Sequence, residues 1–326
     1  MTDTLEIRPL VSEDAEKLTA CFERCYGDSY VVGFFYDPAE IRARMADGRV
    51  RSVIAVSREG EIVGHMAMMR PHPGALTVEL GNTIVDPRYR GNGLAARLGA
   101  ALFEACRTGG YVGFHHYPTT AHAIMQKLAV QAGGVETGVM LSYIPDGTDY
   151  RDLGGKSEKG RLAVVVVYQP LAATPARTVF LPARFATMLR EIYARAGLAR
   201  EVLGSSVPVA TSPSRLRARL DARRNLLRIE VERIGDDLLE RVEDAAERAP
   251  AEVTHLDLLL SDPGVPHAVE ALCDRGFLFC ALLPEFAACD VIRLQRLRSE
   301  LKALPDLVYP EAREILAATL ADRVSG

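Results

Sequence analysis

The sequence lacks the features that mark secreted and membrane proteins. No basic region followed by an apolar one is found among the first residues, so we expect no signal peptide. The longest notable apolar run, residues 162–167, is far too short to cross a bilayer. The six cysteines form neither Cys-x-x-Cys pairs nor a dense framework, which indicates reduced thiols. We therefore expect a cytoplasmic protein without a membrane partner.

An excess of positive charge is also missing. The formal net charge of −4 gives no electrostatic reason to expect a nucleic acid as partner. Only five of the 39 basic residues are lysines and alanine is abundant, a composition typical of GC-rich bacterial genomes.

What the chain does have is length and apolar content. Its 326 residues exceed the usual size of one domain, and 48% hydrophobic residues can form a substantial core. The composition shifts after residue 171 to loops rich in proline, alanine and serine. We therefore predict two domains, residues 1–171 and residues 172–326.

The first domain is predicted to be a mixed α/β unit with a β-α-α-β-β-β-α-β-α-β-β order. Periodicity and turn residues predict helices from about residue 12 and at about 38–47, 94–108 and 120–132. The predicted strands are residues 5–9, 53–57, 62–69, 76–85, 111–117, 135–144 and 161–169.

A glycine-rich turn between a long strand and a helix carries the main functional signal. Gly91 and Gly93 allow positive φ and close approach of the backbone to a ligand. The first amides of the following helix lack carbonyl partners, and the helix dipole adds partial positive charge. Arg88 and Arg90 bring fixed charge that matches phosphate oxygens. The turn is therefore predicted to bind a phosphate or pyrophosphate.

Spacing distinguishes this turn from two common phosphate-binding loops. A Walker loop needs Lys-Ser/Thr after its second glycine, where Leu94 and Ala95 stand here, and a dinucleotide fingerprint needs three glycines early in a βαβ unit. The pattern Arg88-x-x-Gly91-x-Gly93 instead resembles the pyrophosphate loop of the GNAT N-acetyltransferase superfamily. The predicted element order over residues 1–171 also resembles the complete GNAT fold, with the loop after the fourth strand.

This resemblance implies acetyl-CoA as the acyl donor, bound where the fourth and fifth strands splay apart. Backbone groups at the end of the fourth strand would pair with the pantetheine arm, and amides of the turn would bind the pyrophosphate. The positions implied in cofactor binding are Ile84, Val85, Arg88, Arg90, Gly91, Asn92, Gly93, Leu94, Ala95 and His122.

The resemblance also implies catalytic positions. The family often places a glutamate on the fourth strand as general base, and strand alternation puts residues 79, 81, 83 and 85 on one face, so Glu79 is the candidate. The family's usual acid, a tyrosine, is replaced by Ala129, on the same predicted helix face as His122 and Gln126. Two residues that end the fifth strand are candidate substitutes, Tyr117 and His116.

Histidines near these positions raise the question of a metal. His115 and His116 are adjacent on a strand and therefore point to opposite faces, and no carboxylate or cysteine lies at ligand spacing. We predict no metal site. His65 and His72 are interpreted as residues of the groove wall or of a loop.

The second half is predicted to be a partial, degenerate GNAT-like domain. A helix that ends at Gly276 and is followed by two strands parallels the block that ends at Gly133. The position of the phosphate loop holds Glu232, Asp236 and Asp237, whose charges would repel a pyrophosphate. An arginine-rich stretch at residues 212–228 has no interleaved aromatic residues and is interpreted as a solvated face.

Two functions remain open at this point. The first is an N-acetyltransferase that acts on a small-molecule or peptide amine, with the acceptor bound near the junction of the halves. The second is a CoA-binding regulatory or scaffold protein without turnover, which the alanine at position 129 favours. The sequence is compatible with an oligomer, and it determines neither the acceptor nor the length of the acyl chain.

Overall fold

The computed structural model describes residues 5–150, 155–156, 160–203 and 212–321. The elements of the first half are β1 (Glu6–Pro9), η1 (Ser12–Asp14), α1 (Ala15–Tyr26), η2 (Gly33–Tyr36), α2 (Pro38–Ala46), β2 (Val50–Val56), β3 (Ile62–Met69), β4 (Thr77–Val85), η3 (Pro87–Tyr89), α3 (Leu94–Thr108), β5 (Gly113–His116), α4 (Ala123–Gln131), β6 (Val135–Ile144), β7 (Asp149–Tyr150), β8 (Gly155–Lys156) and β9 (Leu162–Pro170).

The second half adds two small parallel strands, a run of longer strands and four helices. Its elements are β10 (Arg177–Phe180), η4 (Ala183–Phe185), α5 (Ala186–Arg195), β11 (Arg200–Leu203), β12 (Arg215–Asp221), β13 (Leu226–Arg233), α6 (Leu238–Arg248), β14 (Val253–Leu259), α7 (Val265–Cys273), β15 (Leu278–Leu283), β16 (Val291–Leu297) and α8 (Pro310–Ala321). Sequence patterns did not predict β10, β11 or α8.

Local sequence explains the helices of the first half. The stripe Leu18, Cys21, Phe22 and Cys25 of α1 is fully buried, as its spacing predicts. The Asp37 side chain accepts hydrogen bonds from the first turn of α2, where a proline occupies the first helical position. Helix α3 packs on one face of strands β2 to β4, while α1 and α2 belong to a separate cluster on the same strands.

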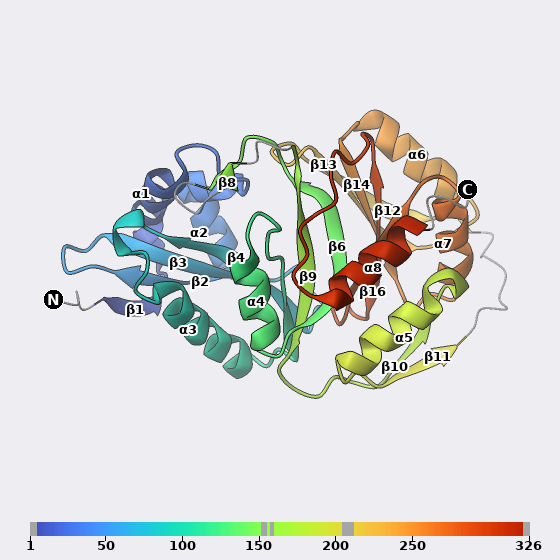
Figure 1. Cartoon of the computed structure of the whole chain (residues 1–326), viewed down its shortest axis with the longest axis horizontal. Helices are drawn as coiled ribbons and strands as arrows, with labels where there is room; N and C mark the ends of the chain where they lie inside the picture. The colour runs from blue at the N-terminus through green and yellow to red at the C-terminus, as the bar shows by residue number, and fades with distance from the viewer. Residues whose placement is uncertain (1–4, 151–154, 157–159, 204–211, 322–326) are drawn as a thin grey trace.

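One mixed sheet runs through both halves in the order β1-β2-β3-β4-β5-β9-β6-β15-β16-β14-β13-β12 (Figure 1). The mixed α/β fold is therefore confirmed. The halves join where β6 meets β15, with Gly138 opposite Ala281. A Cβ atom on Gly138 would lie 2.2 Å from the carbonyl oxygen of Cys280, so the strands can approach this closely only at a glycine.

The same series of pairings occurs twice in this sheet. Strands β3, β4, β5, β9 and β6 pair antiparallel, parallel, antiparallel and antiparallel. Strands β12, β13, β14, β16 and β15 pair in the same series. The division of the chain at residue 171 stays a prediction, because the sheet itself is continuous.

Helices cover both halves of the sheet. The C-terminal α8 lies across the middle of the molecule over β6 (Figure 1), where Ala312 and Leu316 pack against Val139 and Val165. Helices α5, α6 and α7 contribute to the main apolar cluster of the second half. Among the helices that the structure describes, none is long and apolar enough to cross a membrane.

Candidate active site

The glycine turn joins the end of β4 to the start of α3. Gly91 has φ +81° and Gly93 has φ +68°, both in the left-handed region that glycine adopts without strain. Gly93 is the N-cap of α3, and no side chain of the described residues caps the helix there. Cβ atoms built on Gly91 and Gly93 would meet no described atom within 4 Å. The first turn of α3 therefore presents uncapped backbone to an open, bare surface.

Arg88 stabilises this turn internally. The Asp86 carboxylate, 1% exposed, accepts hydrogen bonds from the backbone N, Nε and Nη2 of Arg88 at 3.1, 2.9 and 2.8 Å. Arg24 donates to the same carboxylate from Nε at 2.9 Å. Arg88 also contacts Glu61 at 3.1 Å. The hydrogen bonds from Arg88 and Arg24 lower the pKa of Asp86 well below its usual range. The sequence did not reveal that Arg88 holds the shape of the loop; its contact with a pyrophosphate stays a prediction.

Strands β4 and β5 splay apart just before the turn. They pair only over residues 77–79 of β4 and 113–115 of β5. Within the described structure, residues 80–85 of β4 therefore have no partner strand on that side, although β3 pairs with β4 on the other. Arg90 donates from Nε to the carbonyl oxygen of Val85 at 3.1 Å, which fixes the end of this open edge.

A bulge at Asn82 corrects one expectation about this strand. Asn82 has φ +54°, and the register between β3 and β4 shifts at this point. Ile84 consequently joins the cluster under α1, whereas Val85 packs with Leu80 in the cluster under α3. The prediction that residues 79, 81, 83 and 85 share one face is therefore wrong, because the extra residue reverses the alternation.

Buried His65 holds the bulge. Burial lowers the pKa of His65 to about 4, so the ring is neutral near pH 7. Because a carbonyl only accepts, Nδ1 donates to the carbonyl oxygen of Asn82 at 2.9 Å, and Nε2 accepts from the Ser52 hydroxyl at 2.9 Å. Tyr30 adds a hydrogen bond from its hydroxyl to Oδ1 of Asn82 at 3.0 Å. His65 thus shapes the strand next to the gap.

Glu79 lies on β4 where the strands begin to separate. Its side chain is partly accessible, and Oε1 lies 3.9 Å from the position that a Cβ of Gly81 would take. Burial raises the pKa of Glu79, while Arg224, Arg228 and Arg293 of the second half act in the opposite direction. A carboxylate with a raised pKa is a stronger base near neutral pH than an exposed glutamate.

His116 is the last residue of β5, next to His115, which pairs with Glu79, and Tyr117 follows it. The Tyr117 hydroxyl is buried and has no hydrogen-bond partner among the described residues. Burial, with Glu79 as a further cause, raises the pKa of Tyr117 well above its usual value, so the phenol keeps its proton. His116 packs its ring against Phe114 with centroids 4.6 Å apart, and burial lowers the pKa of His116 to about 4. Tyr117 therefore holds a proton at pH 7, whereas His116 is neutral.

His122 and the helix that follows it lie partly under the C-terminal segment. His122 is the N-cap of α4, and its Nδ1 is buried without a partner in the described chain. Gln126 is bound to that segment instead, because Nε2 donates to Asp306 and Oε1 accepts from Val308. Ala129 packs in the α8 cluster. Gln126 and Ala129 thus face this packing, while contact of His122 with a ligand stays a prediction.

The equivalent turn of the second half is filled by its own chain. The amide of Gly235 donates to the Ser214 hydroxyl at 2.9 Å, and the amide of Ile234 donates to Asp262 at 3.3 Å. A Cβ on Gly235 would lie 2.0 Å from the carbonyl oxygen of Ser212. These amides are therefore engaged internally, unlike those at the start of α3.

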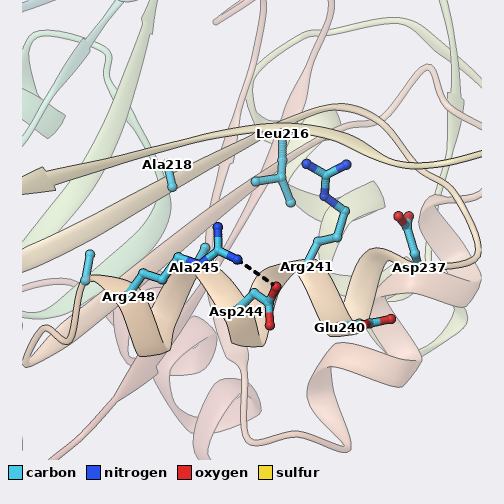
Figure 2. Close-up of a pocket in the computed structure, with 9 residues that line it drawn as sticks. Leu216, Ala218, Asp237, Glu240, Arg241, Asp244, Ala245 and Arg248 are labelled. Carbon is cyan, nitrogen blue, oxygen red and sulfur yellow. Dashed lines mark hydrogen bonds and ion pairs between the residues drawn. The ribbon is translucent and has the colours of Figure 1, made fainter.

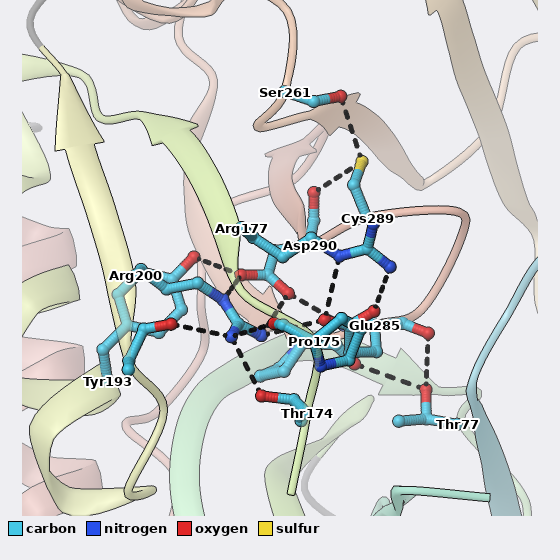
Figure 3. Close-up of polar contacts among 12 residues, drawn as sticks. Thr77, Thr174, Pro175, Arg177, Tyr193, Arg200, Ser261, Glu285, Cys289 and Asp290 are labelled. Atoms are coloured by element: carbon cyan, nitrogen blue, oxygen red, sulfur yellow. Dashed lines mark hydrogen bonds and ion pairs between the residues drawn. The ribbon is translucent and has the colours of Figure 1, made fainter.

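A buried ionic network ties the two halves together behind the gap (Figure 3). Thr77, the first residue of β4, donates to the carbonyl oxygens of Pro284 and Glu285 at 3.3 and 3.1 Å. His115 of β5 donates from Nε2 to Pro284 at 3.1 Å. The Glu285 and Asp290 carboxylates of the same turn are fully buried and bind Arg200. The turn between β15 and β16 thus positions the start of both splayed strands.

The arginine-rich stretch is only partly the solvated face that its composition indicated. Arg215, Arg217 and Arg219 are exposed on the edge strand β12, but Arg224 and Arg228 are partly buried. A hydrophilic pattern alone does not show which arginines turn inward, so sequence reasoning missed these two. A surface groove of about 580 Å³ lies between β12 and α6, lined by Leu216 and Arg241 among others (Figure 2). Its lining residues all belong to the second half.

No group of three or more histidine, cysteine, aspartate or glutamate residues suited to a metal ion occurs in the described ranges. His115 and His116 point apart, since the former contacts Tyr168 and Phe286 and the latter contacts Phe114.

Comparison with known proteins gives one family and a set of similar structures. Residues 15–128 match the model of the acetyltransferase (GNAT) family. The similar structures include the ribosomal-protein-S18-alanine N-acetyltransferase of Escherichia coli, 16% identical, covering 53% of this chain and 97% of that chain with a TM-score of 0.41. A phosphinothricin acetyltransferase of Sinorhizobium meliloti in complex with AcCoA is 20% identical, covering 52% and 89% with a TM-score of 0.40. The search of curated proteins found no match.

Proposed function

We propose that the protein transfers an acetyl group from acetyl-CoA to a primary amine, and the match of residues 15–128 to the model of the acetyltransferase (GNAT) family supports this proposal. The observation that carries the proposal is the combination of two splayed strands with a bare, uncapped helix start at the end of the gap. Both features suit a ligand with an extended amide arm and a pyrophosphate.

The residues at the gap fit acetyl-CoA. The open edge of β4 at Ile84 and Val85 offers backbone groups to the pantetheine amides, as an added strand would. The amides from Arg90 to Ala95, with Gly91, Asn92, Gly93 and Leu94 between them, would bind the pyrophosphate. Because no Cβ stands on Gly91 or Gly93, the phosphate oxygens can approach the backbone.

The transfer needs one base and one acid. The amine must lose a proton before its nitrogen bonds to the carbonyl carbon and the carbon–sulfur bond breaks, and Glu79 receives that proton. The departing sulfur takes a proton, which Tyr117 supplies. Tyr117 is favoured over His116 because burial keeps the phenol protonated, whereas the low pKa of His116 leaves its ring without a second proton. A thiolate with a pKa near roughly 8.5 also leaves without full protonation.

Isothermal titration with acetyl-CoA and a thiol-release assay over a panel of amines test the proposal. Gly91→Glu should abolish acetyl-CoA binding, because it puts a side chain and a negative charge where the pyrophosphate would lie. Gly110→Glu is the matched control, because Gly110 has φ +77°, an equally open environment, and lies just beyond the other end of α3. Unchanged affinity in Gly91→Glu with retained fold would refute the assignment of the loop.

The alternative is a CoA-binding regulator without turnover. The observation in its favour is Ala129, which stands where the family has its acidic tyrosine and is packed under the C-terminal segment. Binding of acetyl-CoA without transfer to any amine of the panel would establish this function instead.

A further inference from the structure

The sheet of the second half has one apolar face, and its other face carries both apolar and polar residues. Leu227, Leu256 and Leu294, on adjacent strands, belong to the apolar cluster with α5, α6 and α7. Each of these leucines is adjacent in the chain to a polar residue. Arg228 lies opposite His255 on the neighbouring strand, and His255 lies opposite Gln295 on the next strand. Strand alternation therefore puts a row of polar side chains on the face away from these helices.

Most charges in this row are balanced. Arg293, 1% exposed, makes a bidentate ion pair with Asp257 at 2.6 and 2.7 Å. Arg224 pairs with Asp221 at 2.7 Å. The charges of these two arginines are thus balanced by carboxylates of their own half, although Nε of Arg224 is buried without a hydrogen-bond partner among the described residues.

Arg228 is the exception. Its Nε is buried without a hydrogen-bond partner, and within the described part of the chain no carboxylate lies at ion-pair distance from it. Arg219 stands directly opposite on β12, so the neighbouring strand adds a like charge. Adjacent like charges on a sheet destabilise it, so local stability does not account for this pair.

His255 has no partner either. It is fully buried, and neither Nδ1 nor Nε2 makes a hydrogen bond to a described residue. Burial, with nearby arginines as a further cause, lowers the pKa of His255 well below its usual value, so the ring is neutral with one donor and one acceptor. Buried polar groups in folded proteins nearly always have hydrogen-bond partners, because leaving them unsatisfied is destabilising, so these groups indicate a ligand.

Tyr143 connects these groups to the proposed catalytic residues. Its ring stacks on His255 with centroids 5.8 Å apart and an interplanar angle of 2°. The Arg224 guanidinium lies over the Tyr143 ring at 5.1 Å, and Tyr117 contacts its edge with centroids 6.4 Å apart. The unpartnered Tyr117 hydroxyl and the unpartnered His255 nitrogens thus flank one aromatic ring.

The turn that carries Arg224 is fixed against the first half. Arg223 donates from Nη1 to the carbonyl oxygens of Asp28 and Tyr30 at 3.1 and 3.0 Å, and its guanidinium lies 5.2 Å from the centre of the Tyr36 ring. The position of the second-half arginines relative to β4 is therefore set by direct contacts.

The result is a site with two ends of opposite charge. Glu79 is close enough to Arg224 and Arg228 for their charges to act on its pKa, yet it forms no ion pair with them among the described contacts. A ligand that fits between a carboxylate and unpaired guanidinium nitrogens carries a cationic amine at one end and an oxyanion at the other.

We propose that the acetyl acceptor is an amine that also carries an oxyanion, either a carboxylate or a phosphate, which Arg228 and His255 bind while the amine faces Glu79. This inference rests on the proposed transferase function and specifies its substrate class. Carboxylate and phosphate share the same recognition chemistry, and the experiment distinguishes them.

The test measures kcat/KM for acetyl transfer in the full chain with matched amines. One arm compares amino acids with their amides, a second compares ethanolamine phosphate with ethanolamine. The expected result is a preference of about 10- to 100-fold for the anionic member of at least one arm, the range expected for one charge-assisted hydrogen bond. Arg228→Gln should remove this preference, measured within the variant as the ratio of kcat/KM for the anionic amine to kcat/KM for its neutral counterpart.

Two further variants protect the test against a folding defect. Arg228→Lys keeps the charge and should retain part of the preference, and Arg248→Gln, whose side chain is 82% exposed on α6, should retain all of it. Thermal unfolding of each variant shows whether it folds.

Equal or faster turnover of neutral amines by the wild type would overturn this inference and leave the transferase function standing. Failure to bind acetyl-CoA or to acetylate any amine would instead refute the proposed function. A preference that survives in folded Arg228→Gln would show that the oxyanion binds elsewhere.

Discussion

Replacement of Arg200 by methionine probes the network that holds the two halves together. Arg200 begins β11, and its side chain is 1% exposed. Its guanidinium donates to Asp290 at 2.6 and 3.1 Å, to Glu285 at 3.0 Å and to the Thr174 hydroxyl at 3.0 Å (Figure 3). Methionine preserves much of the length of the side chain but removes the charge and every one of these bonds.

The expected loss of stability depends on which carboxylate loses its counter-charge. Glu285 keeps Arg177, which donates to both of its carboxylate oxygens at 3.2 and 2.8 Å. Among the described residues Asp290 keeps only neutral donors, the Tyr193 hydroxyl at 2.8 Å and the backbone amide of Glu285 at 3.0 Å. One fully buried carboxylate therefore remains without a cation, and loss of one partner of a buried pair costs about 3–5 kcal/mol. That is a large part of a typical stability of about 5–15 kcal/mol.

Urea unfolding followed by circular dichroism measures the difference. Arg217→Met is the control, because Arg217 is 75% exposed and its ion pair with Glu232 should contribute less than about 1 kcal/mol. The deficit of Arg200→Met should shrink at lower pH, since an orphaned buried carboxylate takes up a proton. If Arg200→Met is no less stable than Arg217→Met at pH 7.5, the network does not stabilise the fold and the reasoning is wrong.

Two further predictions concern single carboxylates. Glu79→Gln should lower kcat by about 10²–10⁴-fold with unchanged affinity for acetyl-CoA, because the amide cannot accept the proton of the amine; initial rates and titration measure this, and an unchanged kcat would exclude Glu79 as base. Glu136 is 3% exposed, and burial raises its pKa from 4.5 to about 7, so the folded protein binds a proton that the unfolded chain has released between these values. The contribution of this group to stability is therefore lost as pH rises from 4.5 to 7, by at most about 3 kcal/mol. Glu136→Gln can still accept a hydrogen bond from the amide of Ala312. Urea unfolding between pH 5 and 8 should show a smaller decline in stability for this variant than for the wild type. If the unfolding free energy of wild type and Glu136→Gln changes equally with pH, this prediction about Glu136 is wrong.

The sequence by itself determined the parts that depend on local patterns. Gly91 and Gly93 indicated a turn with positive φ, and both have it. The apolar stripe of α1, the cap of α2 and the order of helices and strands along the first half also follow from neighbouring residues, because periodicity and turn chemistry act over a few positions. The match of residues 15–128 to the acetyltransferase family agrees with the motif that the sequence alone presents.

Only the tertiary structure decided what depends on contacts between distant segments. The bulge at Asn82 is held by His65 and Tyr30, so simple alternation along β4 gave the wrong face for Val85. The inward turn of Arg224 and Arg228 follows from the docking of their hairpin on the first half. In this docking, Arg223 contacts residues that lie more than 190 positions away in the chain. A charge pattern cannot specify such contacts, because the same arginines are equally soluble on a surface, and burial opposite Glu79 arises only when the two halves pack together.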